Sequence, residues 1–181
     1  MNPTVTAVVM GVSGVGKSTV ALGLVARTGW VFAEGDDLHP PANRAKMAAG
    51  LPLDDADRLP WLRRIARWIG EQEAAGRDAV VTCSALRRAY RDVLREGHPS
   101  VRFIHLFAPT PLIGERVRTR RDHYMPPSLL DSQLAALEPL GPDEPGVVVE
   151  TTGDVDTVVH RVLRAVGRPD VSGPGGPGGP P

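Results

Sequence analysis

Short, nearly continuous apolar runs recur along the chain, and longer segments with a helical pattern separate them. The runs are rich in β-branched residues and span Val5–Met10, Trp30–Ala33, Ala79–Cys83, Val101–Phe107 and Val147–Glu150. Apolar runs of this length and composition are typical of strands that are buried on both faces. The pattern therefore predicts five strands.

Six other segments have the spacing of apolar residues that is typical of helices, and several begin near Pro, Thr, Asp or Ser. They are Ser18–Ala26, Pro41–Ala49, Pro60–Ala75, Arg87–Arg95, Pro111–Arg121 and Asp154–Val166. Alternating strands and helices predict an α/β fold with a five-stranded parallel sheet and helices on both faces. The apolar stripe of Trp61, Ile65, Trp68 and Ile69 is expected in the core or at a subunit contact.

Length and C-terminal composition indicate the domain organisation. A chain of 181 residues has room for one hydrophobic core, so residues 1–170 are expected to form a single domain. Residues 171–181 consist almost entirely of glycine and proline. Because such a composition cannot bury a core, this segment is expected to be a disordered tail.

Charge and cysteine content argue against several classes of protein. Lys plus Arg and Asp plus Glu both total 21, and this formal net charge of zero does not favour nucleic acid or an acidic membrane as a partner. The single cysteine, Cys83, cannot form an internal disulfide. The sequence shows no signal peptide and no apolar stretch near the roughly 20 residues of a spanning helix. We therefore expect a cytoplasmic protein that binds neither nucleic acid nor membrane.

The most specific chemical motif follows the first predicted strand. Residues Gly11–Ser18 read GVSGVGKS and match the phosphate-binding loop G-x-x-x-x-G-K-[ST]. The loop would join a buried strand to a helix N-terminus, where backbone N–H groups and the helix dipole attract anions. Lys17 is expected to reach the terminal phosphates and Ser18 to hold Mg²⁺. The motif predicts a site for a nucleoside triphosphate.

A second polar segment, Glu34 to His39, follows the second predicted strand and reads EGDDLH. Ligands of open α/β sheets bind beyond the carboxyl ends of the strands, so Glu34 and Asp36 are expected to face the phosphate loop. A kinase needs such a carboxylate to accept the proton of an attacking hydroxyl or to hold water around Mg²⁺. The alternative is an acidic turn that only caps the next helix. His39 alone indicates little.

Other candidates have both a structural and a functional interpretation. Arg58 follows three aspartates and either forms a local ion pair or binds a carboxylate or phosphate. Ser84 ends the third apolar run and either caps the helix that carries Arg87 or lines the site. Cys83 is expected to be buried and unreactive, because no histidine lies near it in sequence.

Four arginines, at positions 116, 118, 120 and 121, crowd the end of a predicted helix. The helix dipole favours basic residues in a last turn, so a solvated basic face is one interpretation. The other is a mobile lid over about residues 118–137, which would bring arginines over the transferred phosphoryl group.

The chain closely resembles the gluconate kinase family (gluconokinase of the bacterial thermoresistant type) in segments that follow family order over residues 6 to about 150. These segments are GVSGVGKS, EGDDLHP, PLDDADRLPWL, CSALRRAYRDVLR and HYMPPSLLDSQLAALEPL. The resemblance implies a P-loop nucleoside triphosphate hydrolase fold like that of nucleoside monophosphate kinases and shikimate kinase. It also implies ATP-dependent, Mg²⁺-assisted phosphorylation of D-gluconate at its 6-hydroxyl, and a homodimer.

The resemblance implies roles for individual residues. Those expected to bind the nucleotide are Gly11, Ser13, Gly14, Val15, Gly16, Lys17, Ser18 and Thr19. The residues expected to bind the acceptor are Asp36, His39, Arg58, Ser84, Arg87 and His123. Ser18 and Glu34 are the expected metal residues, and Glu34 stands where relatives can have aspartate. Lys17, Asp36 and the lid arginine Arg120 are the expected catalytic residues.

Three alternatives remain open. Asp143-Glu144-Pro145-Gly146 matches the D-x-x-G motif of a regulatory GTPase, although no N-K-x-D guanine motif accompanies it. Val147–Glu150 could be the metal-binding strand of an ATPase that acts on nucleic acid, although the chain is short for a motor. Within the kinases, another small sugar acid or a shikimate-like acceptor is the alternative to gluconate.

Overall fold

The computed structural model describes residues 2–119 and 127–168. Its strands are β1 (Thr6–Met10), β2 (Val31–Glu34), β3 (Ala79–Thr82), β4 (Val101–Phe107) and β5 (Gly146–Glu150). All neighbouring strands are parallel, and their order in the sheet is β2-β3-β1-β4-β5. The predicted five-stranded parallel sheet is therefore confirmed.

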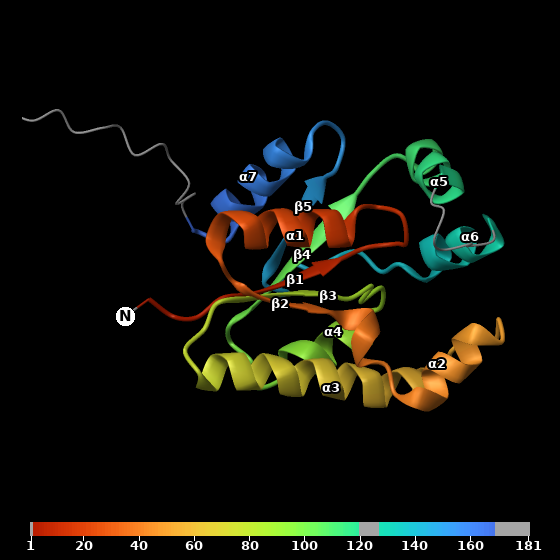
Figure 1. Cartoon of the computed structure of the whole chain (residues 1–181), viewed down its shortest axis with the longest axis horizontal. Helices are drawn as coiled ribbons and strands as arrows, with labels where there is room; N and C mark the ends of the chain where they lie inside the picture. The colour runs from red at the N-terminus through yellow and green to blue at the C-terminus, as the bar shows by residue number, and fades with distance from the viewer. Residues whose placement is uncertain (1, 120–126, 169–181) are drawn as a thin grey trace, which may run out of the picture.

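Helices cover both faces of the sheet, as predicted (Figure 1). The helices are α1 (Lys17–Thr28), α2 (Pro41–Ala48), α3 (Asp55–Ala74), α4 (Arg88–Arg95), α5 (Thr110–Thr119), α6 (Pro127–Ala136) and α7 (Val155–Ala165). A short 3₁₀ helix, η1 (Gly35–Leu38), continues directly from β2. The C-terminal tail, 171–181, lies outside the described residues.

Alternate residues of the central strand β1 belong to two separate cores. Ala7 and Val9 pack with α1 and α7, whereas Val8 and Met10 pack with α3 and α4. The stripe on α3 belongs to the second core, where Trp61, Ile65 and Ile69 are buried and Trp68 packs against them. The expectation that this stripe lies in the core is confirmed. The two cores arise because successive side chains of a buried strand point to opposite faces of the sheet.

Two helix assignments from the sequence are wrong. Helix α3 begins at Asp55, not at Pro60, because Asp54 and Asp57 form reciprocal side-chain to backbone bonds that cap it. Pro60 therefore lies within the helix. Residues 127–136 form helix α6, although the sequence analysis assigned no helix there.

The carboxyl ends of β1, β2 and β3 carry the segments with candidate chemistry. The phosphate loop follows β1, η1 follows β2, and Cys83 and Ser84 follow β3. Figure 1 shows α2 beyond one side of these strand ends and α5 and α6 beyond the other. The sheet order therefore brings segments that are far apart in sequence to one edge, where ligands of such folds bind.

Candidate active site

The phosphate loop has the backbone conformation that its glycines permit. Gly11, Gly14 and Gly16 have φ angles of 141°, 82° and 106°. Gly16 is the N-cap of α1, so Lys17 and Ser18 occupy the first turn of the helix. The Lys17 ammonium donates to the carbonyls of Gly11 (3.0 Å) and Val12 (3.1 Å). The predicted strand, loop and helix arrangement is confirmed.

Glu34 connects the phosphate loop to the neighbouring strands. The Ser18 hydroxyl donates to one Glu34 oxygen at 2.8 Å, and the Thr82 hydroxyl donates to the other. Thr82 in turn accepts from the Gly35 N–H at 3.1 Å. Carboxylate oxygens only accept, so both hydroxyl protons point to Glu34. Sequence reasoning missed Thr82; its polarity within an apolar strand was the available signal.

Ser18 and Glu34 together offer the hard oxygen donors that Mg²⁺ prefers. Within the described ranges, 2–119 and 127–168, no group of three or more His, Cys, Asp and Glu side chains could hold a metal by itself. Magnesium in kinases keeps several waters and is shared with substrate phosphates. The donor set therefore fits a cation that arrives with a nucleotide.

Gly35 fixes the course of η1. A Cβ at this position would lie 1.8 Å from the Thr82 carbonyl oxygen, so no larger residue fits. The Trp61 indole N–H donates to the Gly35 carbonyl at 2.7 Å, which anchors the same residue to α3. Asp36 follows and is exposed on η1. The contacts of Gly35 with β3 and Trp61 therefore fix the backbone at the start of η1, directly before Asp36.

His39 lies buried behind η1, with 5% of its surface exposed. Its ring stacks on Trp61, with centroids 4.1 Å apart and planes 14° apart. Burial lowers the pKa of His39, and the positive charges of Arg44 and Arg58 lower it further, against an opposing effect from Asp36. These effects together favour the neutral form of the His39 imidazole.

Arg58 takes part in a small polar cluster with α4. Its guanidinium donates to the Tyr90 hydroxyl at 3.2 Å and lies 4.0 Å from the Asp55 carboxylate. Tyr90 donates to the same carboxylate at 2.5 Å. The local ion pair of the structural interpretation is present, and its long distance leaves the guanidinium able to bind another anion.

The segment after β3 differs in part from expectation. The N-cap of α4 is Arg87, which is exposed, so Ser84 does not cap this helix. Instead the Ser84 carbonyl accepts from the Gly11 N–H at 3.2 Å, which places Ser84 beside the phosphate loop. Cys83 is buried, and burial raises its pKa to about 12. The expectation that Cys83 is buried is confirmed, and the raised pKa favours the thiol over the reactive thiolate.

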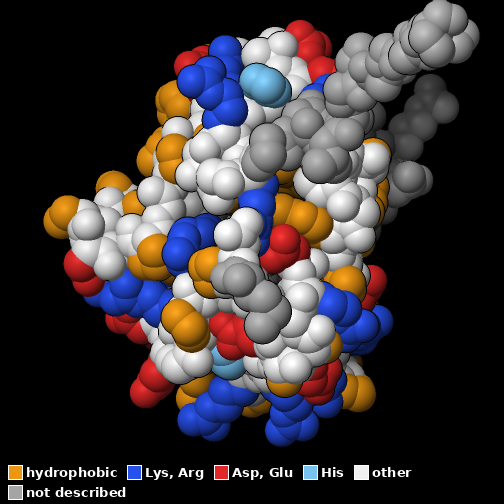
Figure 2. Space-filling model, turned by 90° about the vertical axis from the view of Figure 1, so that its left-hand side faces the viewer, with side chains coloured by type: hydrophobic (Ala, Val, Ile, Leu, Met, Phe, Trp, Pro, Cys, Tyr) orange, Lys and Arg blue, Asp and Glu red, His pale blue; other side chains and the backbone are white. Residues whose placement is uncertain are grey.

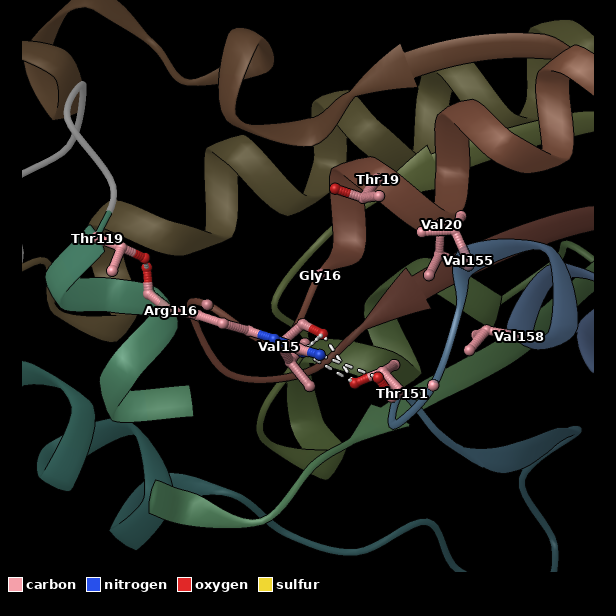
Figure 3. A pocket seen from close by; sticks show the side chains of 11 residues that line it. Val15, Gly16, Thr19, Val20, Arg116, Thr119, Thr151, Val155 and Val158 are labelled. Carbon is pink, nitrogen blue, oxygen red and sulfur yellow. Dashed lines mark hydrogen bonds between the residues drawn. The ribbon is translucent and has the colours of Figure 1, made fainter. Parts of the chain in front are cut away.

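A cavity of about 350 Å³ opens beside the phosphate loop (Figure 3). Its lining comes from the loop, α1, α5, the segment before α7 and α7 itself: Gly14, Val15, Gly16, Thr19, Val20, Arg116, Thr119, Thr151, Gly153, Val155 and Val158. The apolar valines and the adjacent glycine loop suit a ring system attached to phosphates. Sequence reasoning missed the segment before α7, because nothing in its composition marks it.

Arg116 extends from α5 to the wall of this cavity (Figure 3). It donates to the Val15 carbonyl at 3.1 Å and to the Thr151 carbonyl at 3.0 Å. The Thr151 hydroxyl also donates to Val15, at 3.0 Å. Arg116 is therefore neither a solvated basic residue nor free to move alone. Arg120 and His123, predicted as lid and acceptor residues, lie outside the described residues.

The D-x-x-G segment of the GTPase alternative is bound to α4. Asp143 receives two hydrogen bonds from Arg88, at 2.9 and 2.6 Å. Glu144 pairs with Arg91 at 2.6 and 3.1 Å, and both side chains are fully buried. These acids bind arginines of the protein itself. Their contacts support a structural role.

No helix within the described part of the chain is long and apolar enough to cross a membrane. Figure 2 shows the surface on the left-hand side of Figure 1, where basic and acidic side chains are interspersed. Neither sign forms a continuous patch on that face. This surface lacks the basic stripe that is typical of nucleic-acid binding.

Comparisons with known proteins agree with this geometry. A family model described as an AAA domain matches residues 7–140. A gluconokinase of Gluconobacter oxydans is 52% identical over 157 residues, which cover 87% of this chain and 88% of the relative. The crystal structure of a gluconokinase from Sinorhizobium meliloti superposes with a TM-score of 0.78 at 42% identity, covering 91% and 92% of the two chains.

An unliganded sugar kinase from Janibacter sp. superposes with a TM-score of 0.85 at 50% identity, covering 91% of this chain and 95% of its own. The relatives therefore match most of the chain, and the family model spans the phosphate loop and the segment after β2. The chain belongs to the gluconokinase family of P-loop kinases.

Proposed function

We propose that this chain transfers the terminal phosphoryl group of ATP to the 6-hydroxyl of D-gluconate, forming 6-phospho-D-gluconate. The observation that carries the proposal is the Ser18 to Glu34 hydrogen bond. It joins the phosphate loop to the strand end that continues into Asp36 and His39, so donor and acceptor residues share one edge of the sheet. The relatives named gluconokinase match most of the chain.

ATP would occupy the cavity and the loop together. The nucleoside would lie between the loop, Thr151 and Val155, in a space of about 350 Å³. The phosphates would then run along the loop to Lys17, whose ammonium would exchange two backbone carbonyls for phosphate oxygens. Ser13, Gly14, Gly16 and Thr19 complete the phosphate-binding surface in this proposal.

Mg²⁺ would be held by the Ser18 hydroxyl, with Glu34 ordering its shell. When bound, the ion supplies positive charge that offsets the phosphate oxygens during transfer. Glu34 already orients the Ser18 hydroxyl and is itself fixed by Thr82. The chain therefore contributes a hydroxyl oxygen in a fixed orientation and one carboxylate beside it.

On the acceptor side, Asp36 would orient the 6-hydroxyl and accept its proton as the new P–O bond forms. Gluconate carries one carboxylate and five hydroxyl groups, so its site needs arginine and several hydrogen-bonding side chains. Arg58, Arg87, His39 and Ser84 would supply these. His39 follows η1 after β2, and Ser84 and Arg87 follow β3. Arg58 lies on α3, and its charge acts on His39, which supports its assignment to the same site.

A lid over about residues 118–137 would close on the bound substrates, bringing Arg120 over the transferred group and His123 toward the acceptor. Closure excludes water, which otherwise competes as the acceptor. Helix α6 forms the C-terminal part of this segment, and its Gln133 accepts from the Ser13 N–H at 2.7 Å. That contact supports a coupling between the lid and the phosphate loop.

We also propose a homodimer, which the family resemblance implies, and a cytoplasmic location, which a single cysteine without a disulfide partner in the chain fits. Sedimentation equilibrium tests the homodimer. A dimer gives a mass of twice the 19.3 kDa chain, and a single species at the chain mass across micromolar concentrations contradicts it.

A coupled ADP-release assay tests the proposed function. The acceptors to compare are gluconate, other aldonates, shikimate and nucleoside monophosphates, each with ATP and with GTP. We expect the highest kcat/KM for gluconate with ATP. Comparable values for shikimate or a nucleoside monophosphate, or a strong preference for GTP, contradict the proposal.

A further inference from the structure

Asn43, on α2, is buried with 3% of its surface exposed and contacts two groups through its side-chain nitrogen. The nitrogen lies 2.9 Å from the Asp57 carbonyl oxygen and 3.2 Å from Nδ1 of His39. A backbone carbonyl can only accept a hydrogen bond. The atom beside Asp57 is therefore the NH₂ group of the amide, and its second hydrogen is directed at His39.

This orientation determines the proton position on His39. Nδ1 receives a hydrogen bond from Asn43, so Nδ1 carries no proton itself. A neutral imidazole then has its single proton on Nε2. In a charged imidazolium, Nδ1 would also carry a proton. Two hydrogen-bond donors, Nδ1–H and the Asn43 NH₂ group, would then face each other.

The His39 ring cannot turn to escape this constraint. One face is stacked on Trp61 at 4.1 Å. Trp61 is fixed in turn by its hydrogen bond to the Gly35 carbonyl. Two independent contacts, one on the ring face and one at Nδ1, therefore define both the orientation of the ring and the position of its proton.

We propose that Asn43 is a positioning residue that holds His39 as the neutral Nε2–H tautomer, so that His39 presents a hydrogen-bond donor, and no charge, to a hydroxyl oxygen of the acceptor. The inference rests on the proposed function, because it assigns His39 to the recognition of a polyol. A polyol offers oxygen lone pairs to donors that are held in fixed positions.

A neutral His39 leaves the Asp36 carboxylate able to accept the proton of the acceptor hydroxyl. The charged groups that act on His39 are Asp36, Arg44 and Arg58. A cationic His39 would pair with Asp36 and weaken it as a proton acceptor. Burial and the two guanidinium groups lower the pKa of His39, which agrees with the geometry. Asn43 adds the directional constraint that burial alone lacks, since it selects one of two neutral tautomers.

Long-range ¹H–¹⁵N NMR of the histidine side chains tests the tautomer directly in the full chain. The His39 signals are those lost in His39→Gln. We expect the Nε2–H pattern at pH 7 and a midpoint below the ordinary value of 6.5. An Nδ1–H pattern, or an imidazolium at pH 7, overturns the proposal whether or not the chain phosphorylates gluconate.

The Asn43→Asp variant tests the consequence for binding. A carboxylate only accepts, so it would draw the His39 proton to Nδ1 and raise the His39 midpoint. We expect the KM for gluconate to rise about tenfold, the effect of one lost hydrogen bond, with the KM for ATP unchanged. The NMR pattern should change to Nδ1–H in the same variant.

The matched control is Asn43→Asp in the His39→Gln background. Glutamine presents an amide N–H near the position of Nε2 and has no tautomers, so there Asn43→Asp should leave the KM for gluconate within about twofold. If Asn43→Asp raised the KM for gluconate equally in the wild-type and the His39→Gln backgrounds, Asn43 would not act through His39, and the proposal would be overturned. Wild-type protein that shows the Nε2–H pattern but no gluconate turnover would refute the proposed function alone.

Discussion

At the scale of single residues, the proposed reaction depends most on Asp36. It is one of two exposed acids of η1, and it directly follows Gly35, whose contacts with β3 and Trp61 fix the start of η1. We expect Asp36→Asn to lower kcat for gluconate phosphorylation by at least about 100-fold, because an amide cannot accept the hydroxyl proton. The dissociation constant for ATP, measured by calorimetry, should not change, since the carboxylate serves the acceptor.

Asp37 provides the control for this prediction. It is the next residue on η1, is also exposed, and carries the same charge. Asp37→Asn should keep nearly full activity. Equal losses in the two variants would indicate a general effect of charge at η1, and normal turnover by Asp36→Asn would remove Asp36 from the mechanism.

Residue-level contacts were the hardest to predict. The motif correctly predicted that Lys17 and Ser18 lie where the loop meets α1, because this placement follows from neighbouring residues of one loop. Thr82 bonds to Glu34 across 48 positions and Arg91 to Glu144 across 53, so no local pattern reveals them. Of the two interpretations of Ser84, the helix cap was wrong, because the N-cap of α4 is Arg87.

At the scale of secondary-structure elements, η1 depends on the absence of a side chain at Gly35. In Gly35→Ala the Cβ would lie 1.8 Å from the Thr82 carbonyl oxygen, so η1 must move away from β3. We expect a loss of about 1–3 kcal/mol in the free energy of unfolding and a fall in kcat, because Asp36 moves with η1. Urea denaturation and the coupled assay measure the two effects.

Gly114→Ala is the matched control. Gly114 lies within α5, and an added Cβ would meet no heavy atom within 4 Å. Alanine favours a helix by about 0.5–1 kcal/mol over glycine, so this variant should be at least as stable as the parent. If both substitutions destabilised the chain equally, the close approach of Gly35 to β3 would not be the cause.

A second element-level prediction concerns the ion pair that ties α4 to the segment before β5. Glu144→Gln leaves the fully buried Arg91 guanidinium without a counter-charge. We expect the free energy of unfolding to fall by about 3 kcal/mol. Asp143→Asn, which removes an exposed partner of Arg88, should cost much less.

The ion pair of Glu144 and Arg91 makes the free energy of unfolding depend on pH. Burial tends to raise the pKa of Glu144, but hydrogen bonds from Arg91 and the Gly141 N–H hold it below the ordinary value of 4.5. Glu144 therefore binds a proton more weakly in the folded chain than in the unfolded chain. Its stabilisation is complete above about pH 4.5 and is lost as the pH falls through the folded value. The stability difference between the parent and Glu144→Gln should shrink over that range in urea titrations.

The elements themselves were largely predictable, because hydrophobic periodicity determines them locally. All five strands were identified within about one residue, whereas the start of α3 was placed at Pro60. Proline favours the first turn of a helix, but the capping pair of Asp54 and Asp57 moved the start upstream. Helix α6 was missed because prolines and a short apolar pattern favoured a loop.

At the scale of the whole molecule, the parallel sheet places the parts of a two-substrate site together. The order β2-β3-β1-β4-β5 sets the end of β3 between the phosphate loop and η1. Thr82 and Ser84 from that strand end bond to both neighbours, through Glu34 and Gly11. The sequence predicted the fold and the edge of the sheet where ligands bind. It could not predict the cavity beside the phosphate loop, which forms only when α5 and the segment around the start of α7 pack against the loop.

The most direct test of the central claim is the ³¹P NMR spectrum of the reaction of the full chain with ATP, Mg²⁺ and gluconate. Transfer to the 6-hydroxyl predicts ADP and one new phosphomonoester whose phosphorus couples to the two protons of a CH₂ group. The signal should be absent when gluconate is omitted. Release of inorganic phosphate alone, or a monoester coupled to a single proton, would contradict the proposed reaction.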